Sequence, residues 1–315
     1  MKPGRVVLTG ATGFIGSYLA EELVARGYEV LALRRTQSDT WRVAAVADQL
    51  TWISTDDADW PQQLQARRPE YLVHSAWLGV GVGQRDDWPS QLSNLTFTMQ
   101  LLQAVSHGGL KKVVLLGSQA EYGAFEGRID ENHPALPTAA YGAVKVATLQ
   151  LVRAYCEAHG LEWYWLRVFA VFGPREDTHW FVSFVAASLL RRQPPDLTGC
   201  EQRYDYLFVP DLARAIVQTL PTAFGKSGVY NIGSNHATGL RKVVDTLATL
   251  THSVAGANYG ALPYRPGQVM HMEGNSDKFE HVFGPIRQTP LAEALAASVA
   301  YVRQSRPPIH PEIIA

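Results

Sequence analysis

A tyrosine and a lysine in the run Tyr-Gly-Ala-Val-Lys have the types and spacing needed for proton transfer. Tyr141 and Lys145 are four residues apart near the start of a helical pattern, so they lie on one helix face about one turn apart. An adjacent ammonium group favours the phenolate, and we therefore expect Lys145 to lower the pKa of Tyr141 from its usual value of about 10. The tyrosine could then donate a proton to a carbinol oxygen or remove one from it.

A serine at the end of an apolar run supplies a second polar group. Ser118 follows residues 113–117, which predict a buried parallel strand. Ligands of doubly wound sheets bind at the carboxyl ends of the strands. A hydroxyl group there could hydrogen-bond the same oxygen as Tyr141, so we expect Ser118, Tyr141 and Lys145 to form one catalytic group.

Three glycines spaced three residues apart predict a phosphate-binding loop. They follow an apolar run at residues 5–8 and open an amphipathic pattern over residues 15–23. Gly10 permits a tight turn, Gly13 lets the backbone approach a pyrophosphate, and Gly16 lets the helix pack close to the sheet. The N-terminus of that helix faces the anion with unpaired N–H groups. The loop residues that we expect to contact a dinucleotide are Gly10, Thr12, Gly13, Phe14, Ile15 and Gly16.

Two arginines at the end of the next predicted strand indicate which dinucleotide binds. A carboxylate at this place would hydrogen-bond the ribose hydroxyls of NAD, whereas here the strand ends in Arg34 and Arg35. Guanidinium groups hold a phosphate in bidentate fashion. We therefore expect NADP (as NADPH) rather than NAD, with Lys145 on the nicotinamide ribose. A solvated arginine pair at a strand end is the alternative.

Alternating short apolar runs and longer helical patterns position these residues. The predicted strands and long helices are residues 5–8, 29–33, 50–54, 71–74, 111–116 and 162–169, and residues 92–105 and 139–159. This alternation predicts an α/β fold with a Rossmann-like, doubly wound parallel sheet and a smaller C-terminal substrate-binding lobe. We expect residues 1–172 to form the NADP-binding Rossmann domain, to which residues of about 205–232 return. Residues 173–315 would mainly form the substrate-binding lobe.

The glycine loop, the serine at a strand end and the Tyr-x-x-x-Lys pair together resemble a known family. In this order they are similar to the extended short-chain dehydrogenase/reductases that modify nucleotide sugars, the epimerase/dehydratase/4-ketoreductase family, and the resemblance runs through nearly the whole chain. It implies a nucleotide-sugar substrate and a homodimer that pairs through the two long helices. It also implies further cofactor contacts at Asp56, Ser75, Ala76, Asn94 and Phe169.

Departures from the family pattern reduce the number of reactions that we expect this chain to catalyse. In the family's 4,6-dehydratases the active-site threonine is followed by Asp and Glu, whereas Gln119 and Ala120 follow Ser118 here. Neither can act as that acid/base pair, so we do not expect dehydration. The family's substrate-phosphate arginine directly precedes an aspartate, whereas Tyr204 separates Arg203 from the next aspartate.

Several side chains near the predicted cleft could contact the substrate. They are Trp77, Gln119, Glu121, Trp180 and Arg203. Trp77 could form the floor of a sugar pocket because it follows the cofactor-lining segment, and Trp180 lies where the family's substrate loop begins. A packed aromatic cluster is the alternative for Trp180.

The overall composition argues against nucleic-acid-binding, membrane-spanning and metal-binding proteins. The chain has 315 residues, a formal net charge of −1 and 46% hydrophobic residues, which predicts a globular protein with no basic surface for nucleic acid or an anionic membrane. Cys156 and Cys200 lack metal-type spacing, so we expect no metal site. No stretch approaches the ~20 apolar residues that span a bilayer, and the run at residues 6–8 is too short for a signal-peptide core. We expect a cytoplasmic enzyme.

Together these observations predict an NADPH-dependent reductase of a nucleotide-linked 4-keto-6-deoxysugar. Tyr141 would donate the proton and Ser118 would hydrogen-bond the carbonyl oxygen. The family resemblance implies that reductases draw on NADPH while epimerases retain NAD. Three alternatives stay open: a nucleotide-sugar epimerase with bound NAD(P), a non-catalytic NADP-binding regulator, and a reductase of a non-nucleotide aldehyde or ketone. The intact Ser-Tyr-Lys set argues against the regulator, which does not need all three.

Overall fold

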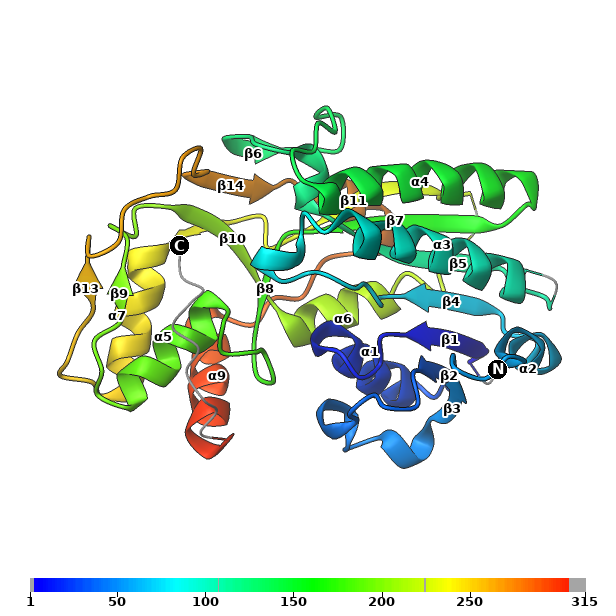
Figure 1. The fold of residues 1–315 in the computed structure, drawn as a ribbon, viewed down its shortest axis with the longest axis horizontal. Coiled ribbons are helices and arrows are strands. Elements are labelled where there is room, and N and C mark those ends of the chain that lie inside the picture. The colour runs from blue at the N-terminus through cyan, green and yellow to red at the C-terminus, as the bar shows by residue number, and fades with distance from the viewer. Residues whose placement is uncertain (1–2, 107, 224, 306–315) are drawn as a thin grey trace.

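A seven-stranded parallel sheet runs through the larger lobe of the molecule (Figure 1). The computed structural model describes residues 3–106, 108–223 and 225–305. The strands of this sheet are β1 (Arg5–Thr9), β2 (Glu29–Arg34), β3 (Thr51–Ser54), β4 (Tyr71–His74), β5 (Lys112–Ser118), β7 (Glu162–Val168) and β11 (Gly228–Ile232). Their spatial order is β11-β7-β5-β4-β1-β2-β3, and all six pairings are parallel. The predicted doubly wound α/β fold is confirmed.

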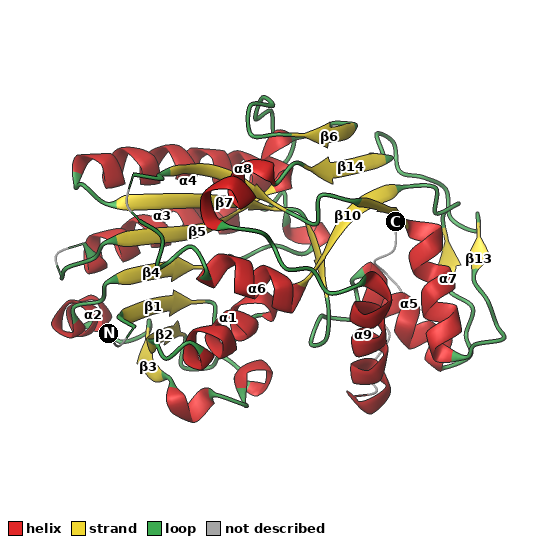
Figure 2. Ribbon diagram, turned by 180° about the vertical axis from the view of Figure 1, so that it is seen from behind, coloured by secondary structure: helices red, strands yellow, loops and turns green. Residues whose placement is uncertain are grey.

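Helices cover both faces of this sheet. One face carries α1 (Phe14–Ala25), α6 (Val209–Val217) and α8 (Asp277–Phe283), and the other carries α2 (Trp60–Arg67), α3 (Trp88–Val105) and α4 (Ala140–Ala158) (Figure 1, Figure 2). Successive side chains of a strand point to opposite faces. On β1, Val6 and Leu8 are therefore buried on the α1 face and Val7 on the α3 face, which explains why the strands are apolar throughout.

A second sheet and three helices form a smaller lobe beside the first (Figure 2). Its strands are β6 (Gly127–Ile129), β8 (Ala170–Phe172), β10 (Arg203–Phe208), β12 (Ala237–Gly239) and β14 (His271–Gly274). Their order is β12-β10-β14-β6, with β8 paired to β10. The helices α5 (Phe181–Leu190), α7 (Leu240–Thr251) and α9 (Leu291–Ser305) enclose a separate apolar core. Two short strands, β9 (Asp196–Leu197) and β13 (Asn258–Tyr259), pair at its edge.

Short 3-10 helices lie in the connections of the larger lobe. They are η1 (Trp41–Val43), η2 (Ala47–Gln49), η3 (Val82–Gln84) and η4 (Gln119–Tyr122). Among the helices of the described part, none combines the length and the apolar character needed to cross a bilayer.

Some boundaries differ from those predicted. Helix α3 begins at Trp88 rather than Leu92, with Pro89 in its first turn, where a missing N–H has no helical partner to lose. Within residues 205–232, β10 belongs to the second sheet and β11 to the large one. The domain division at residue 172 stays a prediction, and residues 1, 2 and 306–315 of the predicted ranges lie outside the described part.

The strand order brings the predicted site segments to one edge of the large sheet. Strands β1 and β4 are neighbours, but the chain continues from β1 toward β2 on one side and from β4 toward β5 on the other. Ligands of open α/β sheets bind where the order reverses in this way. The glycine loop follows β1, Ser75 follows β4, and Ser118 ends β5, so all three lie at the carboxyl ends of the strands.

Candidate active site

Tyr141 and Ser118 meet at the carboxyl end of β5. Ser118 is the last residue of that strand, and Tyr141 lies in the first turn of α4. The Ser118 side chain is close enough to the Tyr141 hydroxyl to influence its pKa, and Tyr141 is only 8% exposed. Ser118 Oγ also accepts a hydrogen bond of 3.2 Å from the N–H of Ala120. The backbone of η4 therefore helps to orient the serine hydroxyl.

The pKa of Tyr141 is raised, not lowered. Burial raises it most, the hydrogen bond with Ser118 and the positive charge of Arg85 oppose that shift, and the charge of Glu121 adds to it. The prediction that Lys145 lowers this pKa is corrected, because removal from water outweighs the favourable interactions. The Arg85 guanidinium carbon lies 5.2 Å and Lys145 Nζ 5.8 Å from the centre of the Tyr141 ring, so two cations lie near the ring, and the charge of Arg85 is the one that lowers this pKa.

Lys145 lies behind the tyrosine and is fully enclosed. Its Nζ donates a hydrogen bond of 2.6 Å to the Leu116 carbonyl oxygen and lies 3.5 Å from the centre of the Trp77 ring. Burial lowers the pKa of Lys145 to about 7, while the charge of Glu121 opposes this shift. The carbonyl oxygen and the ring face both favour the ammonium form. Lys145 can therefore carry a proton near neutral pH without leaving the protein interior.

Trp77 is held over Lys145 by a buried glutamine of α3. Gln91 Oε1 accepts a hydrogen bond of 2.8 Å from the Trp77 indole, and its Nε2 donates one of 2.8 Å to the Gly79 carbonyl oxygen. The Trp77 ring stands edge-on to Tyr141, with ring centres 6.2 Å apart. Trp77 therefore lies in the catalytic group, and its contact with a sugar stays a prediction.

Asn94 fixes the same loop, and its predicted cofactor contact stays a prediction. Its Oδ1 accepts a hydrogen bond of 2.7 Å from the Leu78 N–H, and its Nδ2 donates bonds of 3.1 Å to the carbonyl oxygens of Leu78 and Ser90. The residue is buried. Because the loop and the helix use both of its polar atoms, Asn94 positions the loop.

The glycine loop is packed too closely for side chains. Gly10 has a φ of +73°, and a Cβ there would lie 2.8 Å from both the Ser75 hydroxyl and the Ala76 N–H. A Cβ on Gly16 would overlap the Gly10 carbonyl group. Thr12, Phe14 and Ile15 are half-buried around it. Among the described residues, no side chain caps α1 at Gly13 and no acidic residue occupies its first turn, so its N–H groups fit a pyrophosphate.

The second cofactor segment lies at the end of β2. The Arg34 guanidinium carbon lies 4.6 Å from the centre of the Trp52 ring, and Arg35 is exposed. Asp56 Oδ2 accepts a hydrogen bond of 2.7 Å from the Thr36 N–H. This bond, the Thr36 hydroxyl and the charge of Arg35 lower the pKa of Asp56. The carboxylate therefore braces the backbone beside Arg35.

Comparison with known proteins identifies the family. Residues 6–233 match the model of the NAD dependent epimerase/dehydratase family. The chain belongs to this family. The resemblance to the extended short-chain dehydrogenase/reductases is thereby confirmed.

Individual relatives are similar over most of their length. A UDP-glucose 4-epimerase of Mycolicibacterium smegmatis is 28% identical over 311 residues, 95% of this chain and 98% of that protein. The dTDP-6-deoxy-L-talose 4-dehydrogenase (NAD(+)) of Aggregatibacter actinomycetemcomitans is 26% identical over 272 residues, 86% of this chain and 99% of that protein. The solved structure of MoeE5 in complex with UDP-glucuronic acid and NAD is 30% identical and has a TM-score of 0.83, covering 96% of this chain and 100% of that one.

Of two further predicted ligand contacts, the one of Glu121 is corrected and the one of Phe169 stays a prediction. Glu121 has no exposed surface, and its carboxylate is bonded to Ser118, Trp165 and Arg167, so it cannot reach a substrate. Phe169 is buried in a small apolar cluster, with its ring centre 6.5 Å from that of Phe125. In both cases the side chain is turned into the protein.

The remaining predicted site residues are divided between the two lobes. Ser75 Oγ donates a hydrogen bond of 2.8 Å to the Thr9 carbonyl oxygen and so ties β4 to β1. Gln119 is half-buried in η4. Trp180 precedes α5, with its ring centre 5.1 Å from that of His179, and Arg203 is exposed at the start of β10. Substrate binding by Gln119, Trp180 and Arg203 stays a prediction.

Sequence reasoning missed Arg85 and Gln91. Gln91 shares helical spacing with the buried residues Asn94, Thr98 and Leu102 of α3, and that spacing could have placed it on the inner face. Arg85 carries no such signal. It reaches Tyr141 only because the loop folds onto α4, where the Tyr141 N–H donates a hydrogen bond of 2.8 Å to its carbonyl oxygen.

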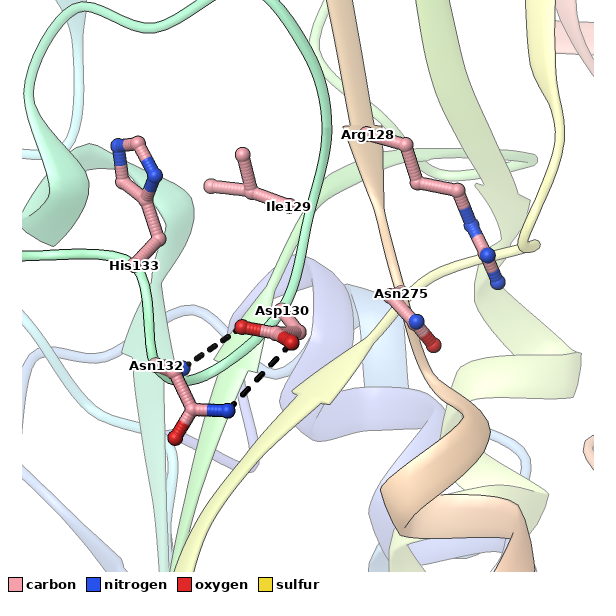
Figure 3. Close-up of a pocket in the computed structure, with 6 residues that line it drawn as sticks. All are labelled: Arg128, Ile129, Asp130, Asn132, His133 and Asn275. Carbon is pink, nitrogen blue, oxygen red and sulfur yellow. Dashed lines mark hydrogen bonds between the residues drawn. The ribbon is translucent and has the colours of Figure 1, made fainter.

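A hollow of about 430 Å³ lies on the second sheet, apart from the catalytic group (Figure 3). Its lining residues are Arg128, Ile129, Asp130, Asn132, His133 and Asn275. Asp130 accepts a hydrogen bond of 2.9 Å from the Asn132 N–H, and Arg128 pairs with Asp277 at 3.3 Å. These polar groups already have partners within the chain, and we assign no ligand to the hollow.

Proposed function

We propose that the chain is a nucleotide-sugar 4-epimerase that uses a bound nicotinamide dinucleotide. The observation that carries this proposal is the grouping of Ser118, Tyr141 and Lys145 at the carboxyl end of the parallel sheet, with the Ser118 side chain close to the Tyr141 phenol and Lys145 bonded to the Leu116 carbonyl oxygen. The likeness to a UDP-glucose 4-epimerase over 95% of the chain supports epimerisation. The epimerase therefore replaces the reductase predicted from sequence as the first candidate.

In this proposal Ser118 and Tyr141 handle the proton of the sugar hydroxyl. Both side chains would bind the oxygen on C4. Tyr141 would take its proton as a hydride leaves the same carbon, which becomes a carbonyl. Return of the hydride to the opposite face, with the proton from Tyr141, would invert the carbon. A bound dinucleotide supplies the hydride acceptor and, when oxidised, a positive charge. Because burial raises the pKa of Tyr141, the phenol needs such a charge to lose its proton near neutral pH.

NADP is the dinucleotide we propose, with NAD as the alternative. Arg35 is exposed beside the half-buried Arg34, where it could pair with a 2′-phosphate. The MoeE5 complex contains NAD, which is why the alternative stays open. We also propose that Lys145 hydrogen-bonds the ribose. A homodimer through α3 and α4, whose Leu92 and Leu151 are about half exposed, and the domain division at residue 172 complete the proposal.

A 4-ketoreductase of a nucleotide-linked 4-keto-6-deoxysugar is the second candidate. It is favoured by the Arg34–Arg35 pair, because a reductase that consumes NADPH needs a phosphate site at this place. The likeness to a dTDP-6-deoxy-L-talose 4-dehydrogenase supports it as well.

Turnover separates the two candidates. The purified protein with UDP-glucose or UDP-galactose should form the 4-epimer, seen by NMR, without net change in the absorbance of reduced nicotinamide. A reductase would instead consume NADPH with a 4-keto-6-deoxysugar nucleotide. Tyr141→Phe should lower the rate by about 100-fold or more. Tyr155→Phe should not, because Tyr155 lies near the other end of the same helix, where its hydroxyl is hydrogen-bonded to Ser106. Full activity of Tyr141→Phe, or no turnover of either substrate, would contradict the proposal.

A further inference from the structure

A buried carboxylate lies directly behind the catalytic serine. Glu121 Oε1 accepts hydrogen bonds of 2.8 Å from the Ser118 N–H and 2.9 Å from the Trp165 indole, and its Oε2 accepts one of 2.8 Å from Arg167 Nε. The carboxylate has no exposed surface, and Arg167 is 5% exposed. A Cβ on Gly117 would lie 2.5 Å from Glu121 Oε1, so the strand end and the carboxylate are in close contact.

The turn that carries Ser118 is fixed at both ends. Ser118 and Glu121 form a reciprocal capping box at the start of η4. At the other end, the Tyr122 hydroxyl donates a hydrogen bond of 2.6 Å to Asn231 Oδ1 on β11, and the Arg167 guanidinium carbon lies 4.3 Å from the Tyr122 ring centre. Strands β7 and β11 thus hold the turn through Arg167 and Asn231. Among these residues, only Glu121 bonds directly to the serine.

Stability alone does not explain this ion pair. Taking two charges out of water costs several kcal/mol per ion, and well-packed apolar residues often replace buried pairs at little loss. The pair does give geometric precision. Hydrogen bonds from Trp165 and Arg167 fix the carboxylate, and the carboxylate in turn fixes the Ser118 backbone N–H.

We propose that Glu121 is a positioning residue, which holds Ser118 through its backbone N–H so that the serine hydroxyl stays beside Tyr141. This inference rests on the proposed function, since it assigns a residue that supports the same catalytic group. Its role is distinct from the substrate contact that the sequence predicted for Glu121, because it acts through Ser118 from the protein interior.

The charge of Glu121 also reaches the other two members of the group. It raises the pKa of Tyr141 and the pKa of Lys145, both on α4. The other charged or titratable groups that face it are Arg167 on β7 and Tyr122 on its own turn. Arg85 faces the phenol from the loop after β4. Loss of the carboxylate charge should therefore lower the pKa of Tyr141, and the pH at which activity depends on that proton should fall.

The test compares Glu121→Gln with Glu162→Gln in the full-length protein. Glu162 lies at the far end of β7, is also buried, and accepts a hydrogen bond of 3.0 Å from the Gly225 N–H, so it controls for the loss of a buried carboxylate. We expect Glu121→Gln to lower kcat on the order of 100-fold with little change in KM, and to move the pH midpoint downward. Glu162→Gln should leave kcat and the midpoint unchanged.

Three outcomes would overturn the proposal. The first is a wild-type kcat for Glu121→Gln. The second is an equal loss of kcat in both variants, and the third is a loss without a shift of the pH midpoint, since a purely structural role would give either. If Glu121→Gln does not fold, the double variant Glu121→Met/Arg167→Met leaves no unpaired buried charge and takes its place. A double variant with wild-type kcat would equally overturn the proposal.

A measurement without substrate separates this inference from the proposed function. Hydrogen exchange of the peptide that contains residues 117–123 should be faster in Glu121→Gln than in wild type, whereas Glu162→Gln should leave it unchanged. If the wild-type protein turns over no nucleotide sugar, the proposed function fails, but the exchange result still decides whether Glu121 fixes the serine turn. If hydrogen exchange of this peptide is the same in Glu121→Gln and wild type, that result alone contradicts the positioning role.

Discussion

At the scale of single residues, the two arginines that end β2 have different environments. Arg34 packs against Trp52 and is half-buried, while Arg35 is exposed next to a carboxylate that braces the backbone. An exposed guanidinium on a fixed backbone can turn toward an added phosphate at small cost in entropy. Arg35 is therefore the residue that should recognise a 2′-phosphate.

Replacing Arg35 tests the choice of dinucleotide. Arg35→Ala should raise the Kd for NADP by about 10- to 100-fold, the value of a lost charge-assisted hydrogen bond, and should change the Kd for NAD little. Fluorescence or calorimetric titration measures both. Arg26→Ala removes another surface arginine, paired with Glu22, and should alter neither Kd. Equal weakening of NAD and NADP by Arg35→Ala would mean that Arg35 does not read the phosphate.

The sequence predicts Ser118 and Tyr141 together but misassigns Glu121 for a physical reason. A strand end and a helix start are local features, and parallel strands bring such ends to one edge of the sheet. The direction of Glu121 depends on Arg167 and Trp165, which lie about 45 residues later on the neighbouring strand. Its burial is thus a tertiary property. The raised pKa of Tyr141 likewise follows from the burial of its own side chain. The spacing of residues in the sequence does not encode that burial.

At the scale of elements, α3 shapes the loop after β4 through two buried amide side chains, those of Asn94 and Gln91. Gln91 bonds to the Trp77 indole and to the carbonyl oxygens of Gly79 and Gln84. The loop contains several glycines, whose backbone freedom leaves its conformation open in the sequence. Helical periodicity predicts α3, but the loop conformation depends on which buried amide meets it, and this is why the loop could not be predicted.

Loss of the Gln91 amide should loosen the loop without unfolding the helix. We expect Gln91→Leu to lower kcat/KM by about 10-fold, because Trp77 no longer has a fixed position over Lys145. Exchange of the peptide with residues 77–84 should rise in parallel. Gln103→Leu changes an exposed glutamine of the same helix and should affect neither quantity. Wild-type kinetics together with faster exchange in Gln91→Leu would show that the loop's order is not needed for turnover.

At the scale of the whole molecule, the larger lobe is predictable and the smaller one is not. The larger sheet is built from strand–helix alternation, so each unit leaves a local pattern in the sequence. The second sheet joins β6 to β14, strands separated by more than a hundred residues. Its strands have three to six residues, too few for a clear period. The only sign of this lobe in the sequence is that the regular alternation of strand and helix patterns fades.

Arg175 joins the two lobes near the glycine loop, together with Arg42 of η1, whose guanidinium donates hydrogen bonds to the Arg175 carbonyl oxygen and to Asp177. Arg175 lies in the connection between β8 and α5, with a positive φ of 69°. Its guanidinium makes two hydrogen bonds to Glu21 of α1, of 2.6 and 3.0 Å, and stacks 3.7 Å from the Tyr18 ring centre. The Tyr18 hydroxyl donates a hydrogen bond of 2.8 Å to the Pro174 carbonyl oxygen. The connection is thereby clamped one turn beyond the N-terminus of α1, where we propose that the pyrophosphate binds.

This clamp should couple dinucleotide binding to the smaller lobe. In the wild-type protein, added dinucleotide should slow hydrogen exchange in residues 181–190 of α5, because an ordered α1 holds the connection through Arg175. In Arg175→Ala that protection should disappear, and the free energy of unfolding should fall by about 1–3 kcal/mol, since the pair is largely buried. Lys111→Ala breaks the exposed pair with Glu70 and should cost less than about 1 kcal/mol while the protection remains. If the protection of α5 persists in Arg175→Ala, dinucleotide binding is coupled to the smaller lobe through contacts other than those of the Arg175 side chain.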